Sequence, residues 1–273
     1  MYVCTTCHNM KFVSFRCKSR FCPTCGVKYS QERSTRMAFK LLNCTHRHCV
    51  FTIDEELRHF FLEDRSLLNC LFRAVQSVIL RMFNKMNQSQ NFVPGFICVL
   101  HTFGRPLEWN PHIHCILSEG GFSDNAIWRP VKHFNYTYLR NAFQTALLNE
   151  MEQHIGPSFK KIKAYIYHKD KNGFYVYAKP NLCDPNTVIK YIGRYLGRPV
   201  IALKRIDSYD GENVTFHYNR HEDNAYVKRT IPAIEFIKLL IQHIPEKHFK
   251  MIRYYGLYAR HRKIDAKLYR AIH

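Results

Sequence analysis

Two histidines in the segment EWNPHIHCIL (residues 108–117) have the types and spacing that could hold a metal ion. His112 and His114 are two positions apart, and side chains two apart on a β-strand share one face. Ile113 between them would then point into the core and anchor the strand. Neutral imidazole is a common metal ligand. The pair therefore predicts either one bound cation or two histidines satisfied by packing and hydrogen bonds.

A third imidazole, His101, lies on the strand expected to pair with the first. It belongs to GFICVLHTF (95–103), which should form a hairpin with residues 111–118 through the loop GRPLEWN. If residue 101 pairs with residue 112 or 114, three imidazoles converge. If it pairs with residue 113, His101 faces away, because a one-residue slip reverses every side chain. The sequence leaves the register open, so a packing role for His101 is the alternative.

The segment THRHC contains a second His-x-His, at His46 and His48. Its middle residue is Arg47, and charged side chains seldom anchor a core. We therefore expect this second pair to be solvated or to lie near phosphate rather than to bind a metal.

Cysteines near the N-terminus form two C-x-x-C knuckles separated by 14 residues, a spacing typical of a structural zinc site. This segment has too few large apolar residues to fold as a small core of unliganded thiols. Cys17 and His8 are further candidate ligands, so the set is not unique. The favoured zinc ligands are Cys4, Cys7, Cys22 and Cys25.

The segment VIKYIGRYLGRP places two phenols on one face of a predicted helix. Tyr191 and Tyr195 are four residues apart, and Lys190, Arg194 and Arg198 follow the same spacing beside them. A tyrosine hydroxyl is a competent nucleophile on phosphorus, and a row of cations suits a phosphate backbone. The alternative, in a chain with 17 tyrosines, is an aromatic stripe packed against a sheet.

The charge of the chain predicts a polyanionic partner. Its 273 residues include 41 Lys and Arg but 21 Asp and Glu, for a formal net charge of +20. Eleven cysteines and the lack of a secretory leader indicate reduced or metal-bound thiols in a cytosolic protein. The apolar runs fall short of the ~20 residues that span a bilayer, so we expect no membrane association.

The elements that must position these residues mix helices with antiparallel hairpins, which predicts an α+β fold rather than a doubly wound parallel sheet. We expect strands at 48–53, 95–103 and 111–118, a hairpin at 161–180, and a further hairpin at 213–219 and 225–231. We expect helices at 28–42, 64–86, 134–154, 184–197 and 232–243.

Four segments together resemble the two-tyrosine rolling-circle transposases of bacterial insertion sequences, which are HUH single-strand endonucleases. These segments are CKSRFCPTCG, HTFGRPLEWNPHIHCIL, YIGRYLGRP and FKMIRYYGLYARHRK. The resemblance covers nearly the whole chain. It implies an antiparallel, ferredoxin-like or RNA-recognition-like core over 43–200, a zinc-binding module with its linking helix over 1–42, and an α+β extension over 201–273.

The resemblance also implies roles for the site residues. His112 and His114 would bind Mg or Mn, with His101 as the candidate third ligand. Tyr191 and Tyr195 would attack single-stranded DNA at element ends and target sites, leaving a 5′-phosphotyrosine and a free 3′-hydroxyl. Lys190, Arg194 and Arg198 would bind the DNA, and the N-terminal cysteines would hold structural zinc.

Two other functions compete with this interpretation. A plasmid replication initiator or conjugative relaxase would use the same chemistry, and a non-enzymatic zinc-containing nucleic-acid-binding protein would explain the charge and the cysteines. The chain also starts only three residues before Cys4, whereas members of the family often have more sequence upstream, which raises the alternative of a shortened copy.

Overall fold

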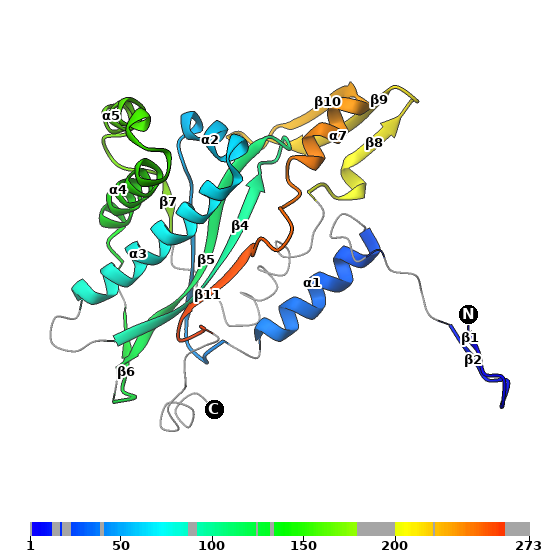
Figure 1. Ribbon diagram of the computed structural model, residues 1–273, viewed down its shortest axis with the longest axis horizontal. Coiled ribbons are helices and arrows are strands. Elements are labelled where there is room, and N and C mark those ends of the chain that lie inside the picture. Colours follow the sequence, from blue (N-terminus) through cyan, green and yellow to red (C-terminus); the bar gives the residue numbers. More distant parts are fainter. Residues whose placement is uncertain are drawn as a thin grey trace.

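The computed structural model describes residues 2–12, 17, 23–38, 41–86, 92–123, 125–131, 134–178, 200–220 and 222–259. The expected tyrosine helix at 184–197 lies outside these residues. Figure 1 shows a central sheet, drawn with β4 and β5 as its longest strands, and a second, smaller sheet near one of its ends.

Within the described residues the central sheet has six strands, in the order β11-β4-β5-β3-β7 with β6 paired to β5. Every pairing in it is antiparallel, so the α+β prediction is confirmed. The three predicted strands in this sheet are present with shifted or extended ends. The strands are β3 (His46–Phe51), β4 (Phe92–Phe103), β5 (Trp109–Ser123), β6 (Trp128–Pro130), β7 (Val176–Tyr177) and β11 (Ile252–Gly256).

Helices cover one face of this sheet, with α3 and α4 side by side (Figure 1). The predicted helix at 64–86 begins as a 3-10 turn (Arg65–Leu67) and continues as α3 (Leu68–Met86). Asp64 caps the turn by accepting a hydrogen bond from the Ser66 backbone N–H. The remaining helices of this layer are α2 (Arg58–Glu63), α4 (Tyr136–Ile155) and α5 (Lys160–Lys169).

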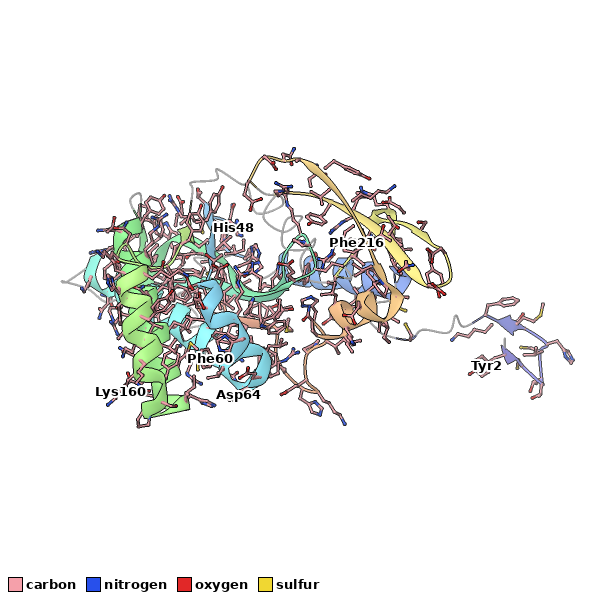
Figure 2. All side chains as sticks on the ribbon, turned by 90° about the horizontal axis from the view of Figure 1, so that it is seen from above. Tyr2, His48, Phe60, Asp64, Lys160 and Phe216 are labelled. Carbon is pink, nitrogen blue, oxygen red and sulfur yellow. The ribbon has the colours of Figure 1, made fainter. Side chains whose placement is uncertain are left out.

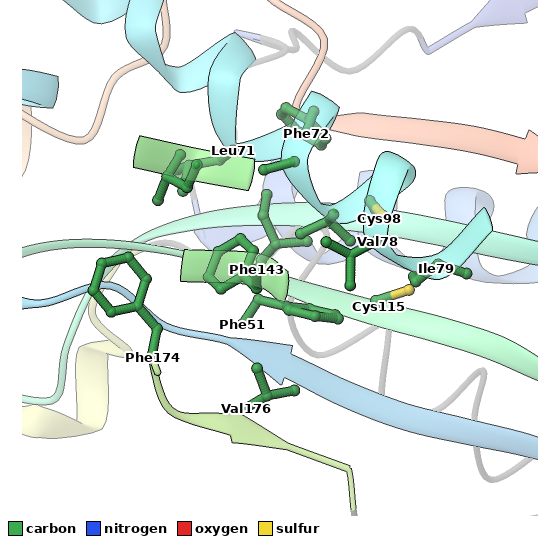
Figure 3. Packing of buried hydrophobic residues seen from close by; sticks show 14 of the residues in the cluster. Phe51, Leu71, Phe72, Val78, Ile79, Cys98, Cys115, Phe143, Phe174 and Val176 are labelled. Carbon is green, nitrogen blue, oxygen red and sulfur yellow. The ribbon is translucent and has the colours of Figure 1, made fainter. Parts of the chain in front are cut away.

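The main core lies between the helices and the sheet. Figure 3 shows Phe51 and Cys115 from the sheet packed with Val78 of α3 and Phe143 of α4. Because strand side chains alternate between faces, the neighbours of these residues face the opposite side of the sheet. Cys115 pairs with Cys49 and Cys98, whereas His114 pairs with Val50 and Val99. The even-numbered residues of β5 near His114 therefore lie on the face away from α3.

Among the described residues, Arg65–Met86 is the one segment whose length and hydropathy would let it cross a membrane. Within its most apolar window 61% is buried inside the protein, and its apolar face packs in the main core. This burial is typical of the central helix of a globular domain.

Residues 161–180 do not form the predicted hairpin. The first half is helix α5, and the described part of the second half, up to residue 178, contributes the two-residue strand β7. The apolar residues Phe159, Ile162 and Ile166 are also three and four apart, and Phe159 and Ile166 are buried. Packing of this helical stripe in the main core outweighs the local alternation of KIKAYIYHK.

The second sheet has the order β10-β9-β8 and packs with helix α7 (Ala233–Ile241) around Phe216, which Figure 2 shows apart from His48 of the central sheet. The predicted hairpin at 213–219 and 225–231 is confirmed, as is the helix predicted at 232–243. Leu107, from the β4–β5 connection, belongs to the same apolar cluster. The strands are β8 (Ile206–Tyr209), β9 (Asn213–Asn219) and β10 (Tyr226–Pro232).

Near the N-terminus the chain forms a two-stranded pair, β1 (Tyr2–Val3) and β2 (Met10–Lys11), and helix α1 (Pro23–Ala38). The helix predicted at 28–42 is thus present, but it starts five residues earlier. The helix starts at Pro23, directly after Cys22, which is the first cysteine of the second knuckle. Proline suits the first turn of a helix.

Candidate metal site on the central sheet

The pairing of β4 with β5 decides the register that the sequence left open. His101 lies directly opposite His112, and Val99 lies opposite His114. Residues that pair directly share a face of the sheet, so all three imidazoles project to the same side. One nitrogen from each of His101, His112 and His114 lies within 4.8 Å of the others. We call these three residues the histidine triad.

The spacing inside the triad suits a single cation. The Nε2 atoms of His112 and His114 are 3.1 Å apart. Two nitrogen ligands about 2.1 Å from one ion and at right angles to each other would be ~3.0 Å apart. The ring centroid of His101 lies 4.4 Å from that of His114 and 5.4 Å from that of His112. The triad can therefore hold one metal ion without a change of strand register.

The orientation of His112 is fixed by its own strand. Its Nδ1 lies 2.7 Å from the backbone carbonyl oxygen of Asn110. A carbonyl can only accept, so Nδ1 carries the proton and Nε2 presents its lone pair to the centre of the triad. A metal-binding histidine commonly has its outer nitrogen held in this way.

Burial favours the neutral form of His112 and His114, which is the form that binds metals. Burial lowers the pKa of His112, and the positive charge of Arg58 acts in the same direction against the hydrogen bond to Asn110. Burial also lowers the pKa of His114 well below its ordinary value, assisted by the neighbouring imidazoles. Within the described ranges no carboxylate joins the triad. Imidazole ligands carry no negative charge, so the charge of a bound cation would remain available to an anionic substrate.

The expectation that His46 and His48 are solvated or lie near phosphate is wrong, because β3 is an interior strand of the sheet. His46 is 0% exposed, Arg47 3% and His48 7%. Arg47 faces the helical layer, where its Nε donates to Glu119 over 2.7 Å and one terminal nitrogen donates to Tyr136 and to the backbone of Ala178. A buried arginine is tolerated when its donors are satisfied in this way.

His48 is a fourth imidazole at the site, and the sequence interpretation missed it. Its Nε2 lies 2.9 Å from His114 Nδ1, and the two rings are stacked with centroids 5.2 Å apart and planes 6° from parallel. The strand pattern HCVFTI carried a usable signal, since it predicts a strand that could pair with 111–118. His46, two residues earlier, contacts instead the Tyr258 hydroxyl, 2.6 Å from its Nε2.

Outside the described residues lie the predicted nucleophiles and DNA-binding cations, which are Tyr191, Tyr195, Lys190, Arg194 and Arg198.

The first cysteine knuckle lies in a turn, in which the His8 backbone N–H donates to the Cys4 carbonyl over 3.0 Å. Hydrogen bonds from the Cys7 and Thr6 backbones lower the pKa of Cys4 to about 7, and a stabilised thiolate is the form that ligates zinc. Cys4, Cys7 and Cys17 are exposed and Cys25 is half-buried. Cys22 lies outside the described residues.

Comparison with known proteins agrees with this picture. A family model described as "Putative transposase" matches residues 95–265, and a "Transposase zinc-binding domain" model matches residues 1–53. The first match includes the whole histidine triad and the predicted tyrosine helix. The second includes both cysteine knuckles. No solved structure matches the chain.

Two curated relatives are similar over almost the whole chain. The transposase for insertion sequence element IS801 of Pseudomonas savastanoi pv. phaseolicola is 28% identical over 267 residues, which cover 93% of this chain and 64% of the relative. "Putative transposase y4qJ" of Sinorhizobium fredii is 30% identical, with 93% and 68% covered. The chain thus spans about two-thirds of the length of these relatives. By these matches the chain belongs to the IS91-type, two-tyrosine family of insertion-sequence transposases in the HUH endonuclease class, with that family's zinc-binding domain at its N-terminus.

Proposed function

We propose that this protein nicks and rejoins single-stranded DNA through a 5′-phosphotyrosine intermediate during rolling-circle transposition. The observation that carries the proposal is the convergence of His101, His112 and His114 on one face of the sheet, in a chain of the two-tyrosine family. The net charge of +20 supports a nucleic-acid substrate.

The triad would hold a divalent cation, Mg or Mn, through neutral ring nitrogens. When bound, such a cation polarises the phosphodiester and offsets the charge that develops on its oxygens. His112 already has its Nε2 lone pair oriented by the Asn110 carbonyl. Nitrogen ligands alone would favour zinc over magnesium, so Mg or Mn is an expectation from the family, and the choice of metal is part of the test.

The phenol of Tyr191 or Tyr195 would be the nucleophile. Its oxygen forms a bond to phosphorus, the bond from phosphorus to the 3′-oxygen breaks, and the proton lost by the phenol is balanced by one gained at the leaving 3′-oxygen. The covalent link to tyrosine is itself a phosphodiester and conserves the energy of the broken DNA bond, so the rejoining reaction needs no nucleotide cofactor. Lys190, Arg194 and Arg198 would lie along the DNA backbone beside the two phenols.

A replication initiator or relaxase would share this chemistry, and the zinc-binding domain together with the family match supports the transposase instead. A zinc protein that only binds DNA would not require three converging imidazoles that can hold a second metal ion.

The test uses labelled single-stranded oligonucleotides that carry candidate element ends, incubated with the zinc-loaded protein and Mn²⁺. A protein–DNA adduct that survives SDS should form. EDTA, added to protein from which free zinc has been removed, should prevent adduct formation. The double variant Tyr191→Phe/Tyr195→Phe should lose the adduct. Tyr165→Phe is the matched control, because Tyr165 is 51% exposed on α5, the opposite layer from the triad. An adduct that persists in the double variant would rule out these nucleophiles.

A further inference from the structure

We infer that His48 is a positioning residue for the metal site: it holds His114 in the tautomer and ring orientation that binding through Nε2 requires. This inference rests on the proposed metal site and assigns a role to a residue that belongs to neither the HUH motif nor the tyrosine helix. His48 itself need not touch the metal or the DNA.

The contact between His48 and His114 joins two neighbouring strands. Val50 of β3 pairs with His114 of β5, so His48 is the next residue of β3 on the same face. From this diagonal position its Nε2 reaches His114 Nδ1 at 2.9 Å, with the rings nearly parallel. His48 is 7% exposed, so bulk water has little access to replace it as a hydrogen-bond partner.

The direction of this hydrogen bond follows from metal binding. A neutral imidazole has one N–H and one lone pair. If the Nε2 lone pair of His114 is given to a cation, Nδ1 must carry the proton and needs an acceptor. His48 Nε2 is placed to be that acceptor, with the proton of His48 then on its own Nδ1. His112 meets the same requirement through the Asn110 carbonyl, 2.7 Å from its Nδ1.

An imidazole can serve here in a way that a backbone carbonyl cannot, because it either accepts or donates. The Nε2 atoms of His112 and His114 are 3.1 Å apart, and His112 Nε2 carries a lone pair because its proton is on Nδ1. Without a cation, His114 Nε2 would therefore donate to His112, and His114 Nδ1 would accept from His48. Cation binding replaces the His114–His112 hydrogen bond with two metal–nitrogen bonds and reverses the bond between His114 and His48, while each ring remains neutral. His48 can therefore satisfy His114 in both states.

The chain supplies a matched control on the same strand. His46 is two residues from His48, faces the same side of the sheet and is also buried. Its Nε2 contacts the Tyr258 hydroxyl rather than a member of the triad. A substitution at His46 therefore disturbs β3 and its packing without removing a partner of a metal-binding imidazole.

The experiment measures Mn²⁺ binding to the zinc-loaded full chain by the electron paramagnetic resonance signal of free Mn²⁺. The variants are His48→Leu, which removes the acceptor, His48→Gln, whose side-chain oxygen can replace it, and the control His46→Gln. His48→Leu should weaken Mn²⁺ binding by about 10- to 100-fold, the usual effect of losing such an outer partner. His48→Gln should recover most of this loss, and His46→Gln should bind as the wild type does.

A second measurement separates positioning from packing. Nitrogen-15 NMR of histidine-labelled protein with Mg²⁺ should show His114 protonated on Nδ1 in the wild type and in His48→Gln. Circular dichroism and thermal unfolding of each metal-free variant report whether the fold is intact.

Three results would overturn the inference. Equal Mn²⁺ affinity in His48→Leu and the wild type would show that His114 needs no partner at this position. Equal losses in the leucine and glutamine variants, with the fold intact, would show a role in packing only. A wild-type protein that binds neither Mn²⁺ nor Mg²⁺ would refute the proposed metal site itself, and the role of His48 with it.

Discussion

His101 and His112 lie directly opposite each other on β4 and β5, and this pairing turns a two-histidine motif into a three-nitrogen site. The strand register shifts immediately beyond them, between His101 and Phe103. An irregularity at this point re-aims the chain toward the loop while leaving the paired histidines aligned.

The first prediction concerns His101. His101→Ala should weaken Mn²⁺ binding and reduce formation of the DNA adduct, because one of three nitrogens that can share a cation is removed. His59→Ala, an exposed histidine on α2, should change neither. Titration calorimetry with Mn²⁺ and the adduct assay measure the two effects. Adduct formation by His101→Ala at the wild-type rate would limit the site to His112 and His114.

The second prediction concerns acid stability. Burial lowers the pKa of His46 from 6.5 to about 4. The unfolded chain therefore binds a proton at this residue near pH 6.5, whereas the folded chain does so only near pH 4. His46 has no effect on the pH dependence above pH 6.5, and stability falls as the pH drops from 6.5 to 4, by at most roughly 3 kcal/mol.

Urea unfolding between pH 4 and 8 tests this. His46→Gln should be less stable than the wild type at pH 7.5, because it loses packing and the contact with Tyr258, but its stability should fall less steeply below pH 6.5. Parallel curves for the two proteins would show that His46 does not contribute to the acid sensitivity.

The third prediction concerns the buried ion pair of Arg47 with Glu119, whose side chains are 4% and 17% exposed. Glu119→Gln should lower the free energy of unfolding by about 3–5 kcal/mol, because it leaves a buried guanidinium without its counter-charge. The comparison is Glu150→Gln, which breaks the more exposed pair with Arg73 and should change stability by less than ~1 kcal/mol. Similar losses of stability in both variants would mean that the hydrogen bonds from Arg47 to Tyr136 and Ala178 are enough to stabilise its buried charge.

The fourth prediction concerns salt. Binding of single-stranded DNA should weaken steeply between about 50 and 200 mM salt, since several phosphate contacts release counterions together. Fluorescence anisotropy with a labelled oligonucleotide measures the slope. Affinity that is flat over this range would indicate that the excess of Lys and Arg serves another purpose.

Much of the fold follows from local patterns in the sequence. The β4–β5 hairpin was predictable because Gly104 and Pro106 interrupt two apolar runs, and helix α3 because its apolar residues repeat at helical spacing after a capping aspartate. The segment around Ile162 and Ile166 fits both the two-residue period of a strand and the 3.6-residue period of a helix, and tertiary packing decides between them. Strand β11 is half-buried along its length, so its sequence shows no strong alternation of apolar and polar residues that would predict a strand.

The candidate site was predictable in its parts but not in its assembly. The motif around His112 and His114 identifies two ligands by local spacing alone. The contribution of His101 depends on strand register, and that of His48 depends on which strand lies next to β5, and neither is encoded by local spacing. Arg47 was misleading, because its suitability for the interior depends on Glu119 and Tyr136, far away in the sequence.

Strand β11 has a consequence for the order in which the central sheet is completed during synthesis. It pairs with β4 along the strand that carries His101, and just beyond it Tyr258 reaches back to His46. A nascent chain still attached to the ribosome before residue 258 has emerged would leave one margin of the sheet bare and this tyrosine contact unmade. The sheet that carries the histidine triad would therefore be complete only after residue 258 has left the ribosome, and a product terminated earlier would lack both contacts.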